Sequence, residues 1–479
     1  MRFRLLEEAA NRNVLINREA LEIMLCEAQP LAFLDGLLTR LGNEALVVGK
    51  SDVLALQACE DALAPVLTKS SAPRNKRHAD IEVLAESDVT GESRCEGKMA
   101  DFAKYFLERY KGIRKILEDE RRRDIGGAMP IERAIRMDRD VKIIGMVSEH
   151  AETKNGHRIL TVEDLSGSCK VLIPKDSEII GESIVNDEVF GIVGKPSSRR
   201  DMIIASALVR PEIPLQNPWE VNDSVSSVAF LGDVHVGSNT FLDSHWERMV
   251  KWMRENAHDM DLDYLVLPGD VVDGIGIYPN QEDELIIADI HQQYAQLAEL
   301  LKELPDHIRI IIQPGNHDAV RPAEPQPALS EVFAESFDSN VVMAGNPAVI
   351  MIEGRRVLSY HGRSLDDWIA SVQHLSYEEP LLAMKDMLSR RHLAPIYGNR
   401  TPLAPEKKDY MLIDKVPDIF VTGHVHGAHA EEYRGVRMVN ASTWQSQTAF
   451  QRMHNFHPDP GVMPIVHLGN GQISMQSFS

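Results

Sequence analysis

Cysteine is scarce in this chain of 479 residues, which contains four. Cys26, Cys59, Cys95 and Cys169 lie far apart and form no Cys-x-x-Cys pair, the spacing typical of thiolate zinc sites and redox dithiols. Small secreted proteins that are held together by disulfides are much richer in cysteine. The sequence therefore argues against a disulfide framework and against a zinc site of the thiolate type.

Long apolar runs are also missing. No stretch of about 18 apolar residues, the length that spans a bilayer, occurs in the sequence. The first residues, MRFRLLEEAANRN, mix arginine and glutamate and lack the apolar segment of a secretory signal. We therefore expect a cytoplasmic protein that does not associate with membranes.

The chain also lacks an excess of positive charge, since its formal net charge is −21. Proteins that coat nucleic acid unaided neutralise its phosphates with lysine and arginine, so the sequence argues against that class. DNA binding is not excluded. Bound divalent cations, a partner subunit or local basic stretches such as 121–123 and 195–200 can supply the attraction.

The length predicts two to four domains, since a single domain usually holds about 100–200 residues. Apolar residues recur at helical spacing near the N-terminus, a polar and charged stretch follows, and strand-like runs begin near residue 140. We expect a small α-helical domain over 1–65, a flexible linker over 66–98, a helix and its connection over 99–129, a β domain over 130–215 and an α/β domain over 216–479.

The β domain is indicated by short apolar or alternating runs. VKIIGMVSEH, HRILTVEDL, SCKVLIP and VFGIVG are separated by turn residues at 155–156 and 166–168. Their order, with Gly145 in the first run, resembles an OB-fold barrel, although a short β-meander shares such signals. OB-folds bind single-stranded DNA by stacking bases on aromatic side chains, and residues 141–189 contain none. A scaffolding or subunit-docking barrel is therefore favoured.

Five polar motifs, each directly after an apolar run, carry the chemistry of the α/β domain. They are GDVH at 232–235, GDVVD at 269–273, GNHD at 315–318, HG at 361–362 and GHVHG at 423–427. Strands buried between layers present the residues at their carboxyl ends along one edge of a sheet, and glycine lets the backbone turn sharply there. Asp, His and Asn supply donors that suit Mn²⁺, Fe or Zn²⁺, and the mixture fits two ions about 3.5–4 Å apart.

Taken singly, these motifs are weak. A Gly-Asp pair after a strand is commonly a turn or a helix cap, and a lone histidine more often lies at a surface. GHVHG is more specific, because histidines two residues apart in a loop can face one metal pocket. The five motifs together, in this order, are not explained by chance.

The set is similar to the motifs of the calcineurin-like metallophosphoesterases, which fold as a β-sandwich flanked by helices. This resemblance implies two divalent cations, with Mn²⁺ expected and Fe, Zn²⁺ or Mg²⁺ as alternatives. Asp270 would bridge them, and Asp273 on the adjoining turn would be a hydrogen-bond partner rather than a ligand. One cation would be held by Asp233, His235, Asp270 and His426, and the other by Asp270, Asn316, His361 and His424.

The same resemblance implies a mechanism. Two cations lower the pKa of a bound water, which attacks phosphorus in line while the phosphate oxygens are neutralised. His317, which follows Asn316 but is not counted among the ligands, would contact the scissile phosphate and protonate the leaving oxygen, oriented by Asp318. The alternative is a histidine that only caps the start of a helix.

Longer stretches around the motifs narrow the family. The resemblance is to the small subunit of the archaeal family D DNA polymerase, which also has a helical region and an OB-fold ahead of its phosphoesterase domain. It implies a 3′–5′ proofreading exonuclease that acts on DNA primer-templates and single-stranded 3′ ends, beside a large polymerising subunit. The stretches are GDVVDGIGIYPNQEDEL (269–285), PGNHDAVRPAEPQPAL (314–329), YHGRSLDDWI (360–369) and VNASTWQSQTAFQ (439–451), within a similarity over about 130–479.

The resemblance implies that Asn316, His317 and Arg363 contact the substrate, and it assigns no chemistry to residues 1–98. Arg363, Asp366 and Asp367, which follow His361, are expected to shape a DNA or subunit contact, although a solvated polar loop would have the same sequence. Accessory B-subunits of eukaryotic replicative polymerases share the architecture, but they have lost metal ligands and serve as scaffolds. This chain retains every ligand. A live exonuclease is therefore preferred over a catalytically idle scaffold and over a stand-alone repair nuclease or phosphodiesterase.

Overall fold

The computed structural model describes residues 15–16, 21, 47–48, 81–119, 124–453 and 456–479. The chain divides into two compact units, Met1–Arg77 and His78–Ser479. In the first unit β1 (Leu15–Ile16) pairs in parallel with β2 (Val47–Val48). The helical domain that the sequence predicts over 1–65 otherwise lies outside the described residues.

The predicted β domain is a closed barrel of five strands. Inward positions of its strands, such as Val141 and Ile143, are buried in one apolar cluster. Gly145 is required in the first strand, because a side chain there would collide with Val162 on the neighbouring strand. The barrel order is β4 (Val141–Glu152), β5 (Arg158–Asp164), β6 (Gly167–Ile173), β8 (Met202–Val209) and β7 (Val189–Pro196).

Three short or medium helices accompany the barrel. The helix expected from residue 99 is α5 (Met99–Leu117), and Asp101 caps its start by accepting from the backbone N–H of Lys98 at 2.9 Å. α5 packs against β4 and β7, and its Tyr110 hydroxyl donates to the carbonyl oxygen of Ile144 at 3.2 Å. The others are α6 (Ile131–Ala134) and the 3-10 turn η1 (Glu178–Gly181).

The rest of the second unit is built on two six-stranded sheets. The first has the order β12 (Val341–Met343), β11 (Arg309–Ile312), β10 (Leu262–Leu267), β9 (Ser227–Phe230), β18 (Val462–His467) and β19 (Ile473–Ser477). The second has the order β16 (Ala428–Tyr433), β17 (Val436–Ala441), β15 (Ile419–Thr422), β14 (Arg355–Ser359), β13 (Ala348–Ile352) and β3 (Ile81–Val83).

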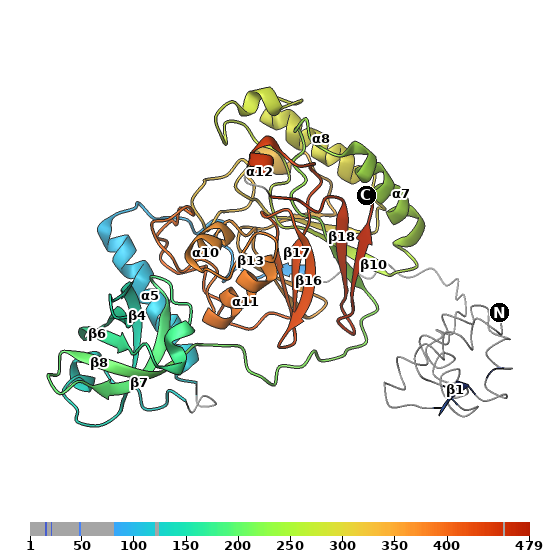
Figure 1. Cartoon of the computed structure of the whole chain (residues 1–479). Coiled ribbons are helices and arrows are strands. Elements are labelled where there is room, and N and C mark those ends of the chain that lie inside the picture. The colour runs from blue at the N-terminus through green and yellow to red at the C-terminus, as the bar shows by residue number, and fades with distance from the viewer. Residues whose placement is uncertain (1–14, 17–20, 22–46, 49–80, 120–123, 454–455) are drawn as a thin grey trace. The chain divides into compact units, whose positions relative to one another are not determined.

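The sheets pack face to face, and helices cover their outer faces (Figure 1). Val228 and Phe230 of β9 lie in the apolar cluster that also holds Val357 and Val421 of the second sheet. The outer face of the first sheet packs against α7 (Asp243–Asn256) and α8 (Ile290–Lys302), and that of the second against α10 (Leu365–Ser371) and α11 (Pro380–Arg390). This is the predicted α/β arrangement of a β-sandwich flanked by helices.

Burial on both faces explains why the strands appear as unbroken apolar runs in the sequence. In β9 Val228 and Phe230 face the second sheet, whereas Ala229 belongs to the cluster under α7 and α8. The connecting loops contain α9 (Glu331–Ala334), α12 (Ala449–Met453) and the 3-10 turn η2 (Gln281–Glu284). Among the described helices none is long and apolar enough to cross a bilayer.

The prediction of a flexible linker over 66–98 is wrong for the second half of that range. Residues Ile81–Val83 form β3, which pairs antiparallel with β13 at the edge of the second sheet. Asp88 then fixes the following turn, accepting from the backbone N–H of Thr90 at 2.7 Å and from that of Gly345 at 2.8 Å. A strand of three residues is too short to change the polar composition of the stretch, so composition alone missed it.

Candidate metal centre

The predicted ligands lie in loops at one edge of both sheets. In the first sheet these loops follow β9, β10 and β11, which are parallel, and in the second they follow β14 and β15, which are also parallel. Parallel strands present their carboxyl ends at one edge. The two edges are joined at the centre, because the backbone N–H of His424 donates to both carboxylate oxygens of Asp233, at 3.0 and 2.9 Å.

Five of the predicted ligands adopt a backbone conformation that residues other than glycine rarely adopt. These are Asp233 (φ +50°), His235 (+52°), Asp270 (+49°), His424 (+68°) and His426 (+52°). Positive φ angles in non-glycine residues cost about 1–3 kcal/mol each, and they cluster at functional sites. The packing of the two sheets must therefore offset a considerable local cost at this one edge.

The first group of donor atoms comprises Asp233, His235 and His426, whose candidate ligand atoms lie within 4.8 Å of one another. Nε2 of His235 is 3.2 Å from Nε2 of His426, and Oδ1 of Asp233 is 3.5 Å from the same His426 nitrogen. Oδ2 of Asp270 is 4.0 Å from Nε2 of His235. All four residues predicted for one cation are thus brought together, and all four are buried.

The second group comprises Asp270, His361 and His424, again with candidate ligand atoms within 4.8 Å of one another. Nε2 of His361 lies 3.3 Å from Oδ2 of Asp270 and 3.0 Å from Oδ1 of Asn316. Asp270 stands between the two groups, which is where a bridging ligand would have to lie. The ligand assignment itself remains a prediction.

Two of the four histidines are held from outside by groups on neighbouring turns. Nδ1 of His235 donates to Oδ1 of Asp273 at 3.0 Å, and Nδ1 of His361 donates to the carbonyl oxygen of Pro268 at 3.1 Å. Such contacts fix the orientation of a ring and leave its other nitrogen facing the centre. Asp273 therefore lies where a hydrogen-bond partner was expected.

The other two histidines are held by residues distant in sequence. Nε2 of His424 lies 3.3 Å from Oδ2 of Asp366, and Nδ1 of His426 lies 2.8 Å from the side-chain amide of Gln451. Neither contact was predicted, because the partners are 58 and 25 residues away from the histidines in sequence, even though both lie in stretches that carry the family resemblance, 360–369 and 439–451.

The donor set suits divalent cations. Asp233 and Asp270 are buried, and among the described residues no lysine or arginine forms an ion pair with either. Burial raises the pKa of Asp233 to about 6. Burial acts to lower the pKa values of His235 and His361, but neighbouring carboxylates, Asp273 and Asp270 respectively, raise both to about 9. Protons thus balance the buried carboxylates, and a divalent cation can take their place.

His317 adjoins both groups and forms a third group with His235 and Asp270, whose candidate ligand atoms also lie within 4.8 Å of one another. Its Nδ1 donates to the carbonyl oxygen of Asp273 at 2.8 Å, and its backbone N–H donates to Oδ1 of Asp270 at 2.8 Å. The centroid of its ring is 4.7 Å from that of His235. Burial lowers the pKa of His317. A lowered pKa favours the neutral form of the ring, and Nδ1 carries a proton because the carbonyl oxygen that it contacts can only accept.

The prediction that Asp318 orients the ring of His317 is wrong. The Asp318 carboxylate accepts from the backbone N–H of Gly315 at 2.8 Å and from the hydroxyl of Tyr294 on α8 at 3.0 Å. The carboxylate is turned towards α8, so it fixes the GNHD turn rather than the imidazole. Orientation of the ring falls to the backbone carbonyl of Asp273 instead.

Arg363, which was predicted to contact the substrate, lies half-buried beside the loop that carries His317. Its Nη1 donates to the carbonyl oxygen of Pro322 at 2.8 Å. This contact holds the guanidinium against the 313–329 loop, which also carries His317. Its contact with a substrate remains a prediction.

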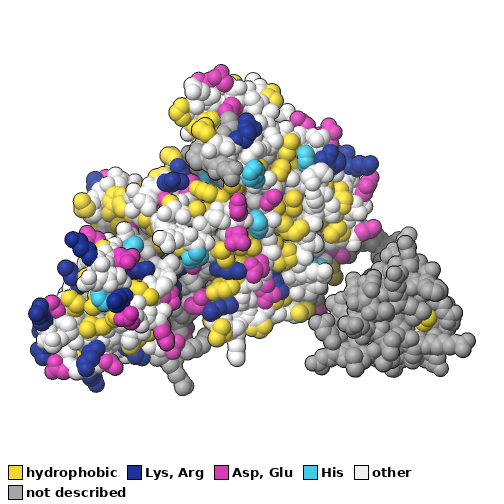
Figure 2. Space-filling model, viewed as in Figure 1, with side chains coloured by type: hydrophobic (Ala, Val, Ile, Leu, Met, Phe, Trp, Pro, Cys, Tyr) yellow, Lys and Arg dark blue, Asp and Glu magenta, His cyan; other side chains and the backbone are white. Residues whose placement is uncertain are grey.

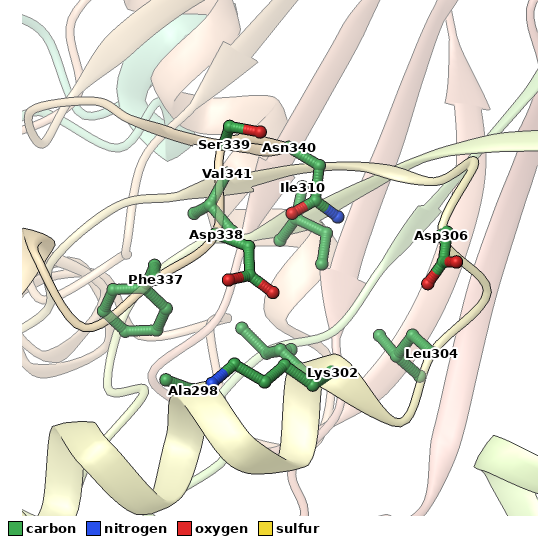
Figure 3. Close-up of a pocket in the computed structure, with 11 residues that line it drawn as sticks. Ala298, Lys302, Leu304, Asp306, Ile310, Phe337, Asp338, Ser339, Asn340 and Val341 are labelled. Carbon is green, nitrogen blue, oxygen red and sulfur yellow. The ribbon is translucent and has the colours of Figure 1, made fainter.

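A cavity of about 540 Å³ lies elsewhere, between the end of α8 and the β11–β12 edge of the first sheet (Figure 3). Its polar side chains are those of Lys302, Asp306, Asp338, Ser339 and Asn340. None of the predicted site residues lines it. The candidate metal centre is therefore separate from this cavity.

Comparisons with known proteins agree on one family. A family model that describes the B subunit of DNA polymerases alpha and epsilon matches residues 228–430. The DNA polymerase II small subunit of Thermoplasma acidophilum is 41% identical over 388 residues, which cover 80% of this chain and 79% of that protein. The protein of the same name from Archaeoglobus fulgidus is 38% identical over 454 residues, covering 92% and 90%. The match to a solved structure described as a novel archaeal phosphodiesterase covers 52% of this chain and 98% of the other, at 13% identity and with a TM-score of 0.27.

Proposed function

Because this chain belongs to the family of archaeal DNA polymerase II small subunits, we propose that its two-sheet domain is a metal-dependent 3′–5′ exonuclease that proofreads DNA beside a large polymerising subunit. One observation carries the proposal. Oxygen and nitrogen donors from both sheets meet in three overlapping groups, which share His235 and Asp270, and the outer ring nitrogen of every histidine predicted as a ligand is held. An idle scaffold has no need of such a costly arrangement.

The residues fit two divalent cations, for which Mn²⁺ is the first choice among Mn²⁺, Fe, Zn²⁺ and Mg²⁺. Two bound cations neutralise phosphate oxygens and lower the pKa of a bound water. Asp270 would contribute to both positions. The ligands of one position would be Asp233, His235, Asp270 and His426, and those of the other Asp270, Asn316, His361 and His424.

The proton on the leaving group comes from His317. Its Nδ1–H is engaged by the carbonyl oxygen of Asp273, so Nε2 is the nitrogen that exchanges a proton with the substrate. The approach of a phosphate anion favours the imidazolium form. As the bond between phosphorus and the 3′ oxygen breaks, Nε2–H protonates that oxygen, and a nucleoside 5′-monophosphate leaves.

DNA must be attracted to a strongly acidic chain. On the face drawn in Figure 2, lysine and arginine side chains form scattered groups rather than one continuous band. The net charge is −21. We therefore assign most of the phosphate contacts to the large subunit and to the bound cations, with Arg363 as a local contact beside the scissile phosphate.

The proposal is tested with the complex of this chain and its large subunit, given a primer-template with a 3′ mismatch and Mn²⁺. The expected products are nucleoside monophosphates released stepwise from the primer, and none after the metal is chelated. A complex that polymerises but never shortens the primer would show that the chain is a scaffold. Cleavage at internal positions of the primer would show that the chain is an endonuclease and not an exonuclease. Equal hydrolysis by the isolated chain would favour a stand-alone nuclease.

Replacement of His317 by alanine is expected to slow hydrolysis of normal DNA by about 10²–10⁴-fold, the usual contribution of a positioned acid. The loss should nearly vanish on a primer whose scissile 3′ oxygen is replaced by sulfur, because a thiolate leaves without a proton. Single-turnover rates on the two primers measure this. An equal loss on both would show that His317 does not donate the proton.

Replacement of Asp366 by asparagine is expected to weaken Mn²⁺ binding by about 10- to 100-fold, because it removes the carboxylate that holds Nε2 of His424. Isothermal titration calorimetry with Mn²⁺ measures the affinity without any substrate. Glu378→Gln, at an exposed position of the adjoining segment, is the matched control. An unchanged Mn²⁺ affinity in Asp366→Asn would show that Asp366 does not support the metal site.

A further inference from the structure

The loop between Asp273 and α8 exposes large apolar side chains. Ile275 is 46% exposed, Ile277 39%, Tyr278 36% and Ile286 72%. Exposed apolar groups that gather at one place commonly mark a binding surface. Nothing among the metal ligands or the proton donor accounts for them.

Two buried glutamines make this loop rigid. Gln281, which is fully buried, donates to the carbonyl oxygen of Asp273 at 2.8 Å and accepts from the backbone N–H of Ile277 at 2.9 Å. Gln293 of α8, also fully buried, accepts from the N–H of Gly274 at 2.9 Å and donates to the carbonyl oxygen of Ile287 at 2.8 Å. The apolar side chains therefore stand on a fixed support, which reduces the entropy lost on binding.

The loop also lies against the proton donor. Gly274, with φ +74°, approaches the carbonyl oxygen of His317 so closely that any side chain there would collide with it. The ring of Tyr278 follows, with its centroid 6.4 Å from that of the His317 ring. A group that packs on Tyr278 is thus within one nucleotide of the place where the phosphate is hydrolysed.

The charge of the loop indicates which part of a nucleotide it can contact. Glu282, Asp283 and Glu284 follow Tyr278 closely, and Oε2 of Glu284 accepts from the Tyr278 hydroxyl at 3.1 Å. Three carboxylates repel a phosphate backbone. An uncharged base has no such penalty, and its flat face suits an aromatic ring.

We propose that Tyr278, with Ile275 and Ile277 of the same loop, is the surface on which the 3′-terminal nucleobase stacks while its phosphate is hydrolysed. The inference rests on the proposed exonuclease function and adds the element that recognises the base. Stacking accepts every base, as an editing site must, but it requires a base that has left the duplex. A mismatched end, which frays more readily, is thereby preferred.

The test combines a change in the protein with a change in the substrate, using the complex with the large subunit and single-stranded oligonucleotides. Tyr278→Ala should lower kcat/KM on a normal 3′ end by about 10- to 100-fold, mainly through KM. Removing the terminal base should cost the wild type a similar factor and cost Tyr278→Ala almost nothing more. Tyr278→Phe, which keeps the ring and loses only the contact with Glu284, should behave as the wild type.

Other results would overturn the inference. If removing the terminal base lowers kcat/KM by the same factor in Tyr278→Ala as in the wild type, the base does not stack on Tyr278. If Tyr278→Ala releases the large subunit in gel filtration, the loop is a subunit contact. Binding of the same oligonucleotides in EDTA, followed by fluorescence anisotropy, separates this inference from the exonuclease itself. A wild type that never hydrolyses DNA defeats the proposed function, whereas loss of base-dependent binding only in Tyr278→Ala would still uphold the stacking surface.

Discussion

Asp270→Asn is expected to reduce the proposed exonuclease activity by at least about 10³-fold, more than the 10- to 100-fold typical of losing a partner that only supports a ligand. Asp270 stands between the two groups of donor atoms. Its neutral amide would remove one negative charge from both cation positions at once. Asparagine is chosen because it tolerates the positive φ of +49° at this position, so the backbone stays in place.

Three measurements check this expectation. Single-turnover hydrolysis gives the rate, inductively coupled plasma mass spectrometry gives the bound metal, and circular dichroism shows that the fold is retained. Asp259→Asn makes the same chemical change at a side chain that is 92% exposed, and it should leave all three unchanged. If Asp270→Asn kept its metals and most of its rate, the two-cation site would not be where we propose it.

Asp409→Asn is expected to lower the free energy of unfolding by about 3–5 kcal/mol, the cost of leaving a buried charge without its partner. Nε of Arg109 on α5 donates to Oδ2 of Asp409 at 2.9 Å, and both side chains are 1% exposed. The same carboxylate oxygen lies 2.8 Å from Nε2 of His392. The pair therefore fastens α5 to the two-sheet domain across 300 residues of sequence.

Urea unfolding, followed by tryptophan fluorescence to which the buried Trp246, Trp368 and Trp444 contribute, measures the loss. Asp414→Asn, at an exposed carboxylate nearby, is the matched control. The double variant Arg109→Met with Asp409→Leu should recover most of the stability, because exchanging a buried ion pair for apolar groups is often neutral. A single variant as stable as the wild type would show that the pair contributes little.

The same pair makes stability depend on pH. Burial acts to raise the pKa of Asp409, but the neighbouring His392 and Arg109 lower it below its usual range. A carboxyl group whose pKa is depressed by folding contributes its full stability above its unfolded pKa of about 3.9 and loses it as the pH falls further. Asp409→Asn should therefore unfold with a weaker dependence on pH below about 4.

Much of the candidate centre could be predicted because its chemistry is local in sequence. Each predicted ligand directly follows a strand, and strands buried on both faces form apolar runs that are easy to find. The partner of an imidazole ring is not local. Asp366 and Gln451 contact their histidines only after the chain has folded. Aspartate and glutamine are too common for the residue type to predict such a contact.

Two predictions were wrong for related reasons. Asp318 adjoins His317 in sequence, yet the turn directs its carboxylate to Gly315 and Tyr294. The carbonyl oxygen that holds the ring belongs to Asp273. Every residue has a backbone carbonyl, so the sequence does not indicate which one makes this contact. The linker was misjudged because Ile81 and Val83 form a strand only when β13 offers them an edge.

The pairing of β3 with β13 also constrains the order of events during synthesis. Ile81 leaves the ribosome about 270 residues before its partner Ile352, which at about 5–20 residues per second corresponds to roughly 15–55 s. The barrel, whose strands all lie between these two positions, is complete well before then. The barrel of the nascent chain can therefore fold before β13 is available to pair with β3.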